Sequence, residues 1–520
     1  MKRRDFIKTS TAVSLPLLLN GFGVRALGRN SLFNAFNGDT DKVLVLIQLN
    51  GGNDGLNMIL PLDQYSKLAN ARPNILIPEN SALLLSPETG LHPVMTGLKS
   101  VYDNARMTVV QGAGYPNQNR SHFRSTDIWT SGSPAEQTWN TGWLGRYLDV
   151  DHVGFPDNYP NPDYPDPFAI TIGSLVSSTC QGVGANYSLA ITDPFNLYPL
   201  ASGGEDTAPN TPYGDELTFM RQSILQTNEY SDVITDAANL GSNLANYPAD
   251  NGLAQQLKNV ALLIKGGLKT RIYVASLGGF DTHANQVEND GDTTIGEHAD
   301  LLKTLSDAVA AFQEDLQLLG LEERVLTMTF SEFGRRIQSN DSFGTDHGSA
   351  APLLIFGSCI NPGLLGDNPD IPDPIGDQDG VALQYDFRDI YGSVLMDWFG
   401  VPQDSILDLL HPEFQYIPVI QPCSPSGSSD LVAQPEEVDL FVYPNPFQSQ
   451  VSIRFTSGHE RVRLSVFDSL SCEREVLFDK VLPAGQHEVP FNGSRLAPGT
   501  YYVRVQLENG RQKSRTLVKI

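Results

Sequence analysis

Six short apolar runs, separated by stretches of helical periodicity, constrain the fold of residues 42–400 more than any other feature. The runs lack the polar–apolar alternation of a half-exposed strand, so they predict strands that are buried on both faces. Between them, residues 297–319 repeat apolar side chains at spacings of three and four, and 215–240 and 253–268 do so less regularly. We therefore predict an α/β fold with a doubly wound, mostly parallel sheet. The predicted strands are 43–49, 107–110, 169–172, 271–276, 325–330 and 352–356.

The end of the chain has a different pattern. Residues 421–437 are rich in Pro, Ser and Gly and are typical of a linker. After them, short runs with strict alternation are separated by Gly, Pro and Asn turns, which predicts an all-β sandwich. The predicted organisation is a signal segment at 1–30, an α/β domain at 31–420, the linker at 421–437 and the β-sandwich at 438–520.

The first 30 residues are basic. Arg3 and Arg4 are followed by Phe6, Lys8 and a weakly apolar run that Pro16 interrupts, and this run is too short for a membrane-spanning helix. No other stretch approaches 18 apolar residues, so we expect a mature protein that does not cross a membrane. The whole chain carries a formal charge of -25, which argues against non-specific nucleic-acid binding. Its four cysteines have no CxxC spacing, which excludes a cysteine zinc site and leaves their pairing open.

Polar side chains gather where the predicted strands end. Ligands of open α/β sheets bind beyond the carboxyl ends of the strands, so these side chains are expected to converge. Carboxylates and histidines that converge at strand ends favour a metal site over the alternative, a structural polar network. The residues concerned are Asp54 after the first strand, Arg120, Ser121, His122 and Arg124 after the second, Asp281 and His283 after the fourth, Glu332 after the fifth, and Asp346 and His347 before the sixth.

The segment around Ser121 precedes a predicted helix. A hydroxyl there lies in the positive end of the helix dipole, which suits a nucleophile that attacks phosphorus or sulfur. Arg120 or Arg124 would then hold the anionic oxygens. The alternative is a serine that only caps the helix.

Together these motifs resemble a known family. Residues 1–400 resemble domain-of-unknown-function family 1501, a group of twin-arginine-exported bacterial proteins, and that family looks like a remote branch of the alkaline phosphatase and sulfatase superfamily. Residues 438–520 resemble the C-terminal sorting domain of the type IX secretion system through Tyr443-Pro-Asn-Pro446 and Leu496-Ala-Pro-Gly-Thr-Tyr501. The motifs matching the first family are GGNDGLN at 51–57, Arg120-Ser-His-Phe123, Gly279-Phe-Asp-Thr-His283, Ser331-Glu-Phe-Gly-Arg335, Thr345-Asp-His-Gly348 and Asp386-Phe-Arg388.

The resemblance implies a divalent metal, zinc first, with one or two ions. By position, Asp281, His283 and His347 would hold the first ion. Asp54 (or Asn50) and Glu332 would stand near the second. Asp346 or His122 would protonate the leaving group or orient a ligand. Calcium is the alternative cation, because the acidic stretch 366–380 offers oxygen ligands, but the spacing of that stretch is not that of an EF-hand and favours a solvated loop.

Two functions follow from these expectations. The first is a secreted, metal-dependent hydrolase of phosphate or sulfate esters, with a small-molecule or polymer substrate. The second is a catalytically inactive binding or scaffold protein of the cell surface, which Phe333 favours because the superfamily has histidine at that step. In both cases the expected partners are the twin-arginine translocase, or other inner-membrane export machinery, and the type IX machinery, which would deliver the protein to the cell surface or beyond.

Overall fold

The computed structural model describes residues 17–19, 22–24, 41–197, 228–288, 291–423, 440–457, 460–468, 473–483, 485–507 and 512–520. Most of the predicted signal segment, most of the predicted linker and the first half of the helical pattern at 215–240 lie outside the described residues. Two short strands, β1 (Leu17–Leu19) and β2 (Phe22–Val24), pair antiparallel. None of the helices within the described ranges combines the length and the apolar composition that a bilayer crossing needs.

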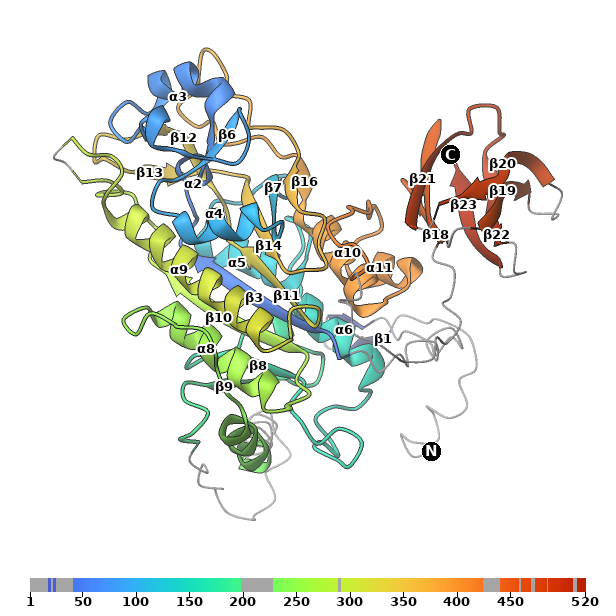
Figure 1. Ribbon diagram of the computed structural model, residues 1–520, viewed down its shortest axis with the longest axis horizontal. Helices are drawn as coiled ribbons and strands as arrows, with labels where there is room; N and C mark the ends of the chain where they lie inside the picture. Colours follow the sequence, from blue (N-terminus) through green and yellow to red (C-terminus); the bar gives the residue numbers. More distant parts are fainter. Residues whose placement is uncertain are drawn as a thin grey trace.

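A nine-stranded, mostly parallel sheet forms the centre of the larger domain (Figure 1). Its strands are β3 (Val43–Asn50), β7 (Met107–Gly114), β8 (Ala169–Ile172), β9 (Ser188–Ile191), β10 (Ile272–Gly278), β11 (Val325–Phe330), β14 (Ala351–Phe356), β15 (Gly363–Leu365) and β16 (Tyr385–Asp386). They lie in the order β15-β7-β14-β11-β3-β10-β8-β9, and β16 also pairs with β7. All six predicted strands belong to this sheet, which confirms the predicted fold class.

The direction of β14 positions one candidate site residue. β14 runs antiparallel to both of its neighbours, β11 and β7, whereas the other pairings in the sheet are parallel. Its first residues therefore lie at the edge where the parallel strands end. His347, at the end of the short strand β13 (Thr345–His347), is brought to that edge just before β14 begins. β13 pairs with β12 (Arg335–Ser339), which follows β11.

Helices cover both faces of the sheet (Figure 1). Alternate residues of β3 point to opposite faces, with Val45 and Ile47 in one hydrophobic cluster and Leu44 and Leu46 in the other, so the strand is buried on both sides as its composition predicts. The first face is covered by α4 (Thr96–Asp103), α8 (Gly252–Lys265), α9 (Glu297–Leu318) and the helical residues 228–240, and the second by α5 (His122–Ser131), α6 (Trp143–Asp151), α10 (Phe387–Phe399) and α11 (Gln403–Leu409).

Smaller elements surround the carboxyl edge of the sheet. They are the helices α2 (Gly55–Met58) and α3 (Tyr65–Ala71) and a three-stranded sheet of β4 (Ile59–Pro61), β6 (Thr89–Leu91) and β5 (Leu83–Leu84). These elements pack beside β12 and β13 at one end of the domain (Figure 1). The loops that carry the candidate site residues are thereby supported from outside the main sheet.

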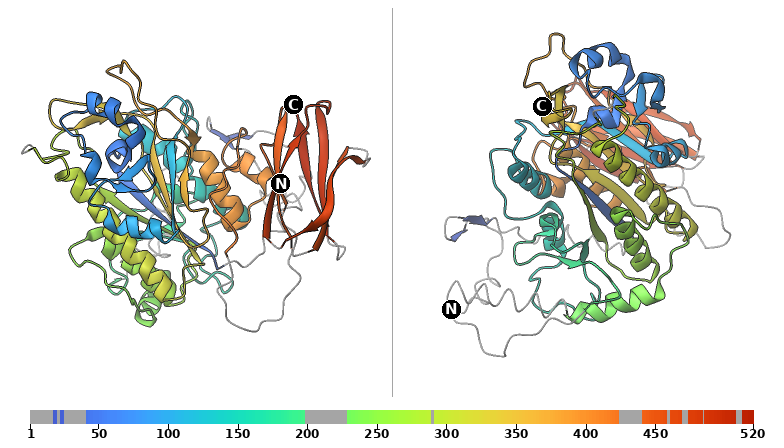
Figure 2. Two further views of the ribbon diagram at one scale, coloured as in Figure 1. Left: turned by 45° about the horizontal axis from the view of Figure 1, so that its top comes forward. Right: turned by 90° about the vertical axis from the view of Figure 1, so that its left-hand side faces the viewer.

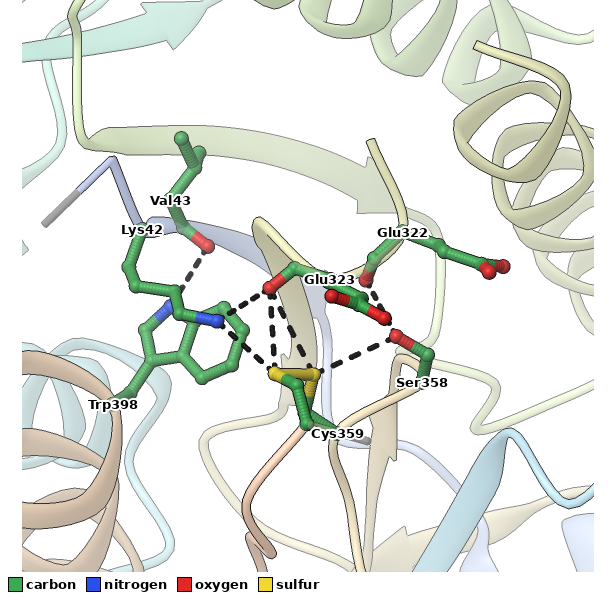
Figure 3. The surroundings of a disulfide bond; sticks show 8 residues. Lys42, Val43, Glu322, Glu323, Ser358, Cys359 and Trp398 are labelled. Carbon is green, nitrogen blue, oxygen red and sulfur yellow. Dashed lines mark hydrogen bonds between the residues drawn. A yellow bond between two sulfur atoms is a disulfide. The ribbon is translucent and has the colours of Figure 1, made fainter. Parts of the chain in front are cut away.

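A disulfide closes the end of the α/β domain (Figure 3). Cys359, just after β14, is bonded to Cys423, which is followed by residues outside the described part of the chain. Lys42 Nζ donates to Cys423 Sγ at 3.1 Å and lies over the Trp398 ring, 4.3 Å from its centroid. The disulfide therefore joins the last described residues of the domain to the end of β14, and Lys42 links them to the start of β3 and to α10. Cys180 is free and buried.

The C-terminal residues form a separate antiparallel sandwich with its own core. One sheet contains β17 (Leu440–Tyr443), β18 (Gln450–Ser457) and β21 (Gly485–Asn492), in that order. The other has the order β20 (Glu473–Leu482), β19 (Glu460–Asp468), β22 (Gly499–Leu507) and β23 (Gln512–Lys519). This arrangement confirms the predicted all-β module.

Candidate metal centre

Three histidines and one aspartate converge at the carboxyl edge of the sheet. His122 opens α5, His283 follows β10 and His347 precedes β14. Their Nε2 atoms lie 3.4, 3.2 and 3.2 Å from one oxygen, Asp281 Oδ1. The Nε2 atoms of His283 and His347 are only 2.9 Å apart. Two bare imidazole nitrogens at that distance repel each other unless a proton or a cation lies between them.

The opposite nitrogen of each imidazole is held by an acceptor. His122 Nδ1 lies 2.8 Å from Glu332 Oε1, and His283 Nδ1 lies 3.0 Å from Asp346 Oδ1. His347 Nδ1 lies 2.8 Å from the backbone oxygen of Arg120. An ionised carboxylate and a carbonyl only accept hydrogen bonds, so a proton on each Nδ1 satisfies these contacts and would leave each Nε2 with a lone pair for a bound cation. This is the arrangement that orients histidine ligands around a metal.

Asp281 is kept ionised. Burial opposes its ionisation, but the hydrogen bond and the charge of Arg335 outweigh burial and lower the pKa of Asp281 to about 2. Arg335 Nη2 lies 2.7 Å from Asp281 Oδ1. Burial is also the main cause of the lowered pKa of His347, which keeps this imidazole neutral at physiological pH. A carboxylate and neutral imidazoles are the protonation states that a divalent metal requires.

The donor set fits zinc. Imidazole nitrogens and a carboxylate oxygen are among the ligands that Zn²⁺ prefers, whereas Ca²⁺ takes six to eight oxygen ligands. Among the described residues, His122, Asp281 and His347 are the group whose donor atoms all lie within 4.8 Å of one another, and His283 adjoins them. Three such ligands would leave the fourth position of a tetrahedral ion open to a water, as in catalytic zinc sites.

Arg335 supports the cluster from beneath. It is 1% exposed, and besides Asp281 it donates to the backbone oxygens of Gly52, Phe280 and Thr345 at 2.7–2.9 Å, and to that of Gly51. Its guanidinium thus joins the loops after β3 and β10 to the segment before β14. Because all of these bonds are internal, Arg335 positions the ligands and does not reach a substrate.

Phe333 forms one wall of the cluster. Its ring centroid lies 4.9 Å from that of His122 and 4.6 Å from that of His347, and the side chain is 1% exposed. Gly52 has a φ of +81°, and a Cβ there would lie 2.3 Å from the Phe333 ring. Glycine is therefore required at this position for both its conformation and its lack of a side chain.

Several predicted site residues lie outside the cluster. The Asp54 carboxylate is buried and accepts from Arg72 Nη1 at 2.8 Å and from Gln286 Nε2 at 2.6 Å. Asp54 is thus paired with a cation of the protein itself. Glu332 and Asp346 bind imidazoles instead of joining the ligand atoms, and Asp346 also pairs with Arg336 at 3.1 Å.

The segment 120–124 divides between the cluster and its surroundings. The exposed Ser121 precedes α5, and its hydroxyl makes no capping hydrogen bond. Arg120 lies at the rim and donates to the backbone oxygen of Gln378 at 2.8 Å. Arg124 donates to the backbone oxygens of Pro134 and Ala135, at 3.2 Å each, and so faces the loop after α5.

The sequence analysis expected His122 at the edge where the strands end and assigned it to proton transfer or to orienting a ligand, but did not predict it as a metal ligand. The available signal was that the Arg120-Ser-His-Phe123 motif follows a strand that ends at the same edge. Glu332 and Asp346 were recognised as site residues, but the sequence does not distinguish a carboxylate that binds a metal from one that binds a ligand's Nδ1. That distinction depends on distances of about 3 Å between residues that are far apart in the chain.

The fold and the cluster define a mixed α/β protein with a candidate metal site and a C-terminal β-sandwich. Residues 246–384 match the family described as protein of unknown function DUF1501, and residues 441–519 match the secretion system C-terminal sorting domain. Both matches fall where the resemblances were predicted, although the first covers only part of residues 1–400; the sorting domain, of the type IX system, directs secretion to the cell surface or the extracellular space. The twin-arginine signal stays a prediction. The DUF1501 match includes Asp281, His283 and His347 but not His122.

Solved structures resemble the chain at low identity. A protein of the alkaline phosphatase superfamily from Vibrio parahaemolyticus has 10% identity and a TM-score of 0.33 over 85% of this chain and 83% of its own. The PsFucS1 sulfatase from Pseudoalteromonas sp. has 10% identity and a TM-score of 0.32 over 91% and 89%. Dimeric latent PorU from Porphyromonas gingivalis matches 17% of this chain with 14% identity and a TM-score of 0.15, and the chain spans only 10% of it. No curated protein matches the chain.

Proposed function

We propose that the protein is a secreted, zinc-dependent hydrolase of phosphate or sulfate esters that works at a single metal centre. The observation that carries the proposal is the convergence of three imidazole Nε2 atoms on Asp281 Oδ1, each with its Nδ1 held by an acceptor. A zinc ion bound there supplies Lewis acidity and lowers the pKa of a bound water. This donor set supports one ion, so we do not propose Asp54 and Glu332 as ligands of a second.

The chain's own residues divide the remaining tasks. Glu332, Asp346 and the Arg120 carbonyl hold the imidazoles in place, and Arg335 holds Asp281. Arg120 is the candidate for binding the ester oxygens, because its guanidinium lies at the rim with a single neighbouring loop as partner. Ser121 is the candidate nucleophile, with water as the alternative, because its hydroxyl is exposed beside His122.

One observation favours a second function, a metal-binding protein of the cell surface without turnover. The guanidinium groups of Arg124 and Arg335 donate to backbone oxygens, so few cationic side chains are left to bind the oxygens of an anionic ester. The acidity of the chain points the same way, because a formal charge of -25 repels anions in general.

Metal analysis and hydrolysis assays separate the two functions. We expect one zinc per chain, and turnover of p-nitrophenyl phosphate or p-nitrophenyl sulfate that His347→Ala abolishes. His487→Ala is the matched control, because His487 is a partly exposed histidine of the sorting domain, outside the α/β domain. Zinc binding without any turnover would favour the surface-binding protein, and a chain that binds no zinc would contradict both.

A further inference from the structure

The β17-β18-β21 sheet of the sorting domain has an outer face that is shielded from solvent at Arg454. Side chains alternate along β17 and β18, so Phe441, Tyr443 and Arg454 point away from the sandwich core. Arg454 lies directly opposite Phe441 on one side and Glu488 on the other. The outer face of such a sandwich ordinarily meets water, yet Arg454 is only 5% exposed. The residues that face inward are Leu440, Val442, Ile453 and Phe455.

The α/β domain provides the cover. The guanidinium of Arg454 lies 4.8 Å from the centroid of the Tyr416 ring and 4.9 Å from that of Phe441, and it donates to the Tyr416 hydroxyl. It also lies 3.7 Å from Asp397 Oδ2, which accepts from the same hydroxyl at 2.7 Å. Tyr416 stacks on Phe441 with an interplanar angle of 11°. Figure 2 shows this sheet against α10 and α11.

The segment that carries Tyr416, which contacts Arg454, is held against α10 by hydrogen bonds within the α/β domain. Asp389, Ser393 and Asp397 are four residues apart and share one face of α10. Asp389 accepts from the backbone nitrogen of Gln415 at 2.8 Å, and the Ser393 hydroxyl accepts from that of Ile417 at 2.8 Å. The disulfide at Cys423 anchors the end of the same segment. Tyr416 is therefore held in position by its own domain.

We propose that Asp397 and Tyr416 form a docking surface for the chain's own sorting domain. The docked state withholds the outer face of the β17-β18-β21 sheet from any export partner until the sorting domain undocks. This inference rests on the secretion domain and is independent of the hydrolase proposal.

The contact has the properties of a reversible one. It buries an ion pair, which seldom adds much net stability because both charges lose their water. Arg454 Nε is buried without a hydrogen-bond partner among the described residues, so part of that loss is uncompensated. When the domains separate, Arg454 regains water and has Glu488 directly across the strand as a partner. Docking is thus specific without being permanent.

Chemical modification of arginine tests docking in the full chain. We expect phenylglyoxal to modify Arg454 about tenfold more slowly than the exposed Arg495 of the same domain, with both sites measured by mass spectrometry. In Tyr416→Ala the Arg454 rate should rise to that of Arg495. Equal rates in the unaltered chain would overturn the proposal.

Small-angle X-ray scattering provides an independent readout. Arg454→Glu places two carboxylates against each other and should increase the radius of gyration, whereas Arg495→Glu, the same charge change on an exposed residue, should leave it unchanged. Asp397→Asn weakens the contact from the other domain and should shift the radius in the same direction. Thermal unfolding confirms that each variant is folded. An unchanged radius in both folded docking variants would overturn the proposal.

Discussion

Glu332 provides the sharpest test of the metal centre, because the structure supports a role in orienting His122 and not the role of a ligand. Its Oε1 lies 2.8 Å from His122 Nδ1 and accepts from the backbone nitrogen of Gly51 at 2.9 Å. The side chain is 3% exposed, so water does not replace these bonds easily. Glu332→Gln keeps the shape and one oxygen acceptor but removes the charge that makes the imidazole a stronger donor of its lone pair.

The expected effect is a loss of zinc affinity without a loss of the site. Removing a carboxylate that orients a histidine ligand typically weakens metal binding by about 10–100-fold. That range corresponds to about 1.4–2.7 kcal/mol. Glu332→Gln should fall near the lower end, because its amide oxygen still accepts from His122. Glu332→Leu removes the acceptor and should fall near the upper end.

A competition titration with a zinc chelator measures both variants against the unaltered protein. Glu322→Gln is the matched control, since it makes the same chemical change in a partly exposed ion pair with Arg106. Its zinc affinity should not change. Two results would refute the reasoning. An unchanged affinity in both Glu332 variants would mean that Glu332 does not orient a ligand, and a complete loss of zinc in Glu332→Gln would mean that Glu332 is itself a ligand.

Three further predictions concern stability. Burial lowers the pKa of His298 to about 4, so the unfolded chain binds a proton at a higher pH than the folded chain does. The free energy of unfolding, measured in urea, should therefore fall by about 3 kcal/mol through this histidine between pH 7 and pH 4. His298→Gln should flatten that pH dependence. Asp315 is fully buried and accepts from two backbone nitrogens, at 2.6 and 2.9 Å, and from the Tyr247 hydroxyl; Asp315→Ala should lower the free energy of unfolding by about 3 kcal/mol or more, and Asp315→Asn by less. The Cys359–Cys423 bond closes a separation of 64 residues, so replacing both cysteines with serine should cost up to about 4 kcal/mol in chemical denaturation.

Each of these has an outcome that contradicts it. A pH dependence that persists unchanged in His298→Gln would assign the effect to other groups. An Asp315→Ala protein as stable as the unaltered one would mean that the freed donors find water. Equal stability of the double-serine variant and the unaltered protein would mean that the disulfide does not constrain the unfolded chain.

Much of the fold could be read from local pattern. Strands that are buried on both faces have almost no polar residues, so the six apolar runs stand out, and the 22-residue helix α9 is clear from its spacing of three and four. The shortest strands of the sheet, β15 and β16, were not predicted, because two or three residues carry no periodicity. The direction of β14 was also not predictable, since an apolar run is the same in either direction.

The candidate site divides in the same way. The sequence alone indicated that Asp281, His283 and His347 lie at strand ends, and that the last part of the chain is a sorting domain, because both depend on residues close together in the chain. Only the tertiary structure decided that His122 joins them, that Glu332 and Asp346 bind imidazoles, that Asp54 pairs with Arg72, and that Cys359 bonds Cys423. These roles depend on distances of a few ångströms between residues tens or hundreds of positions apart, and sequence spacing does not encode such distances.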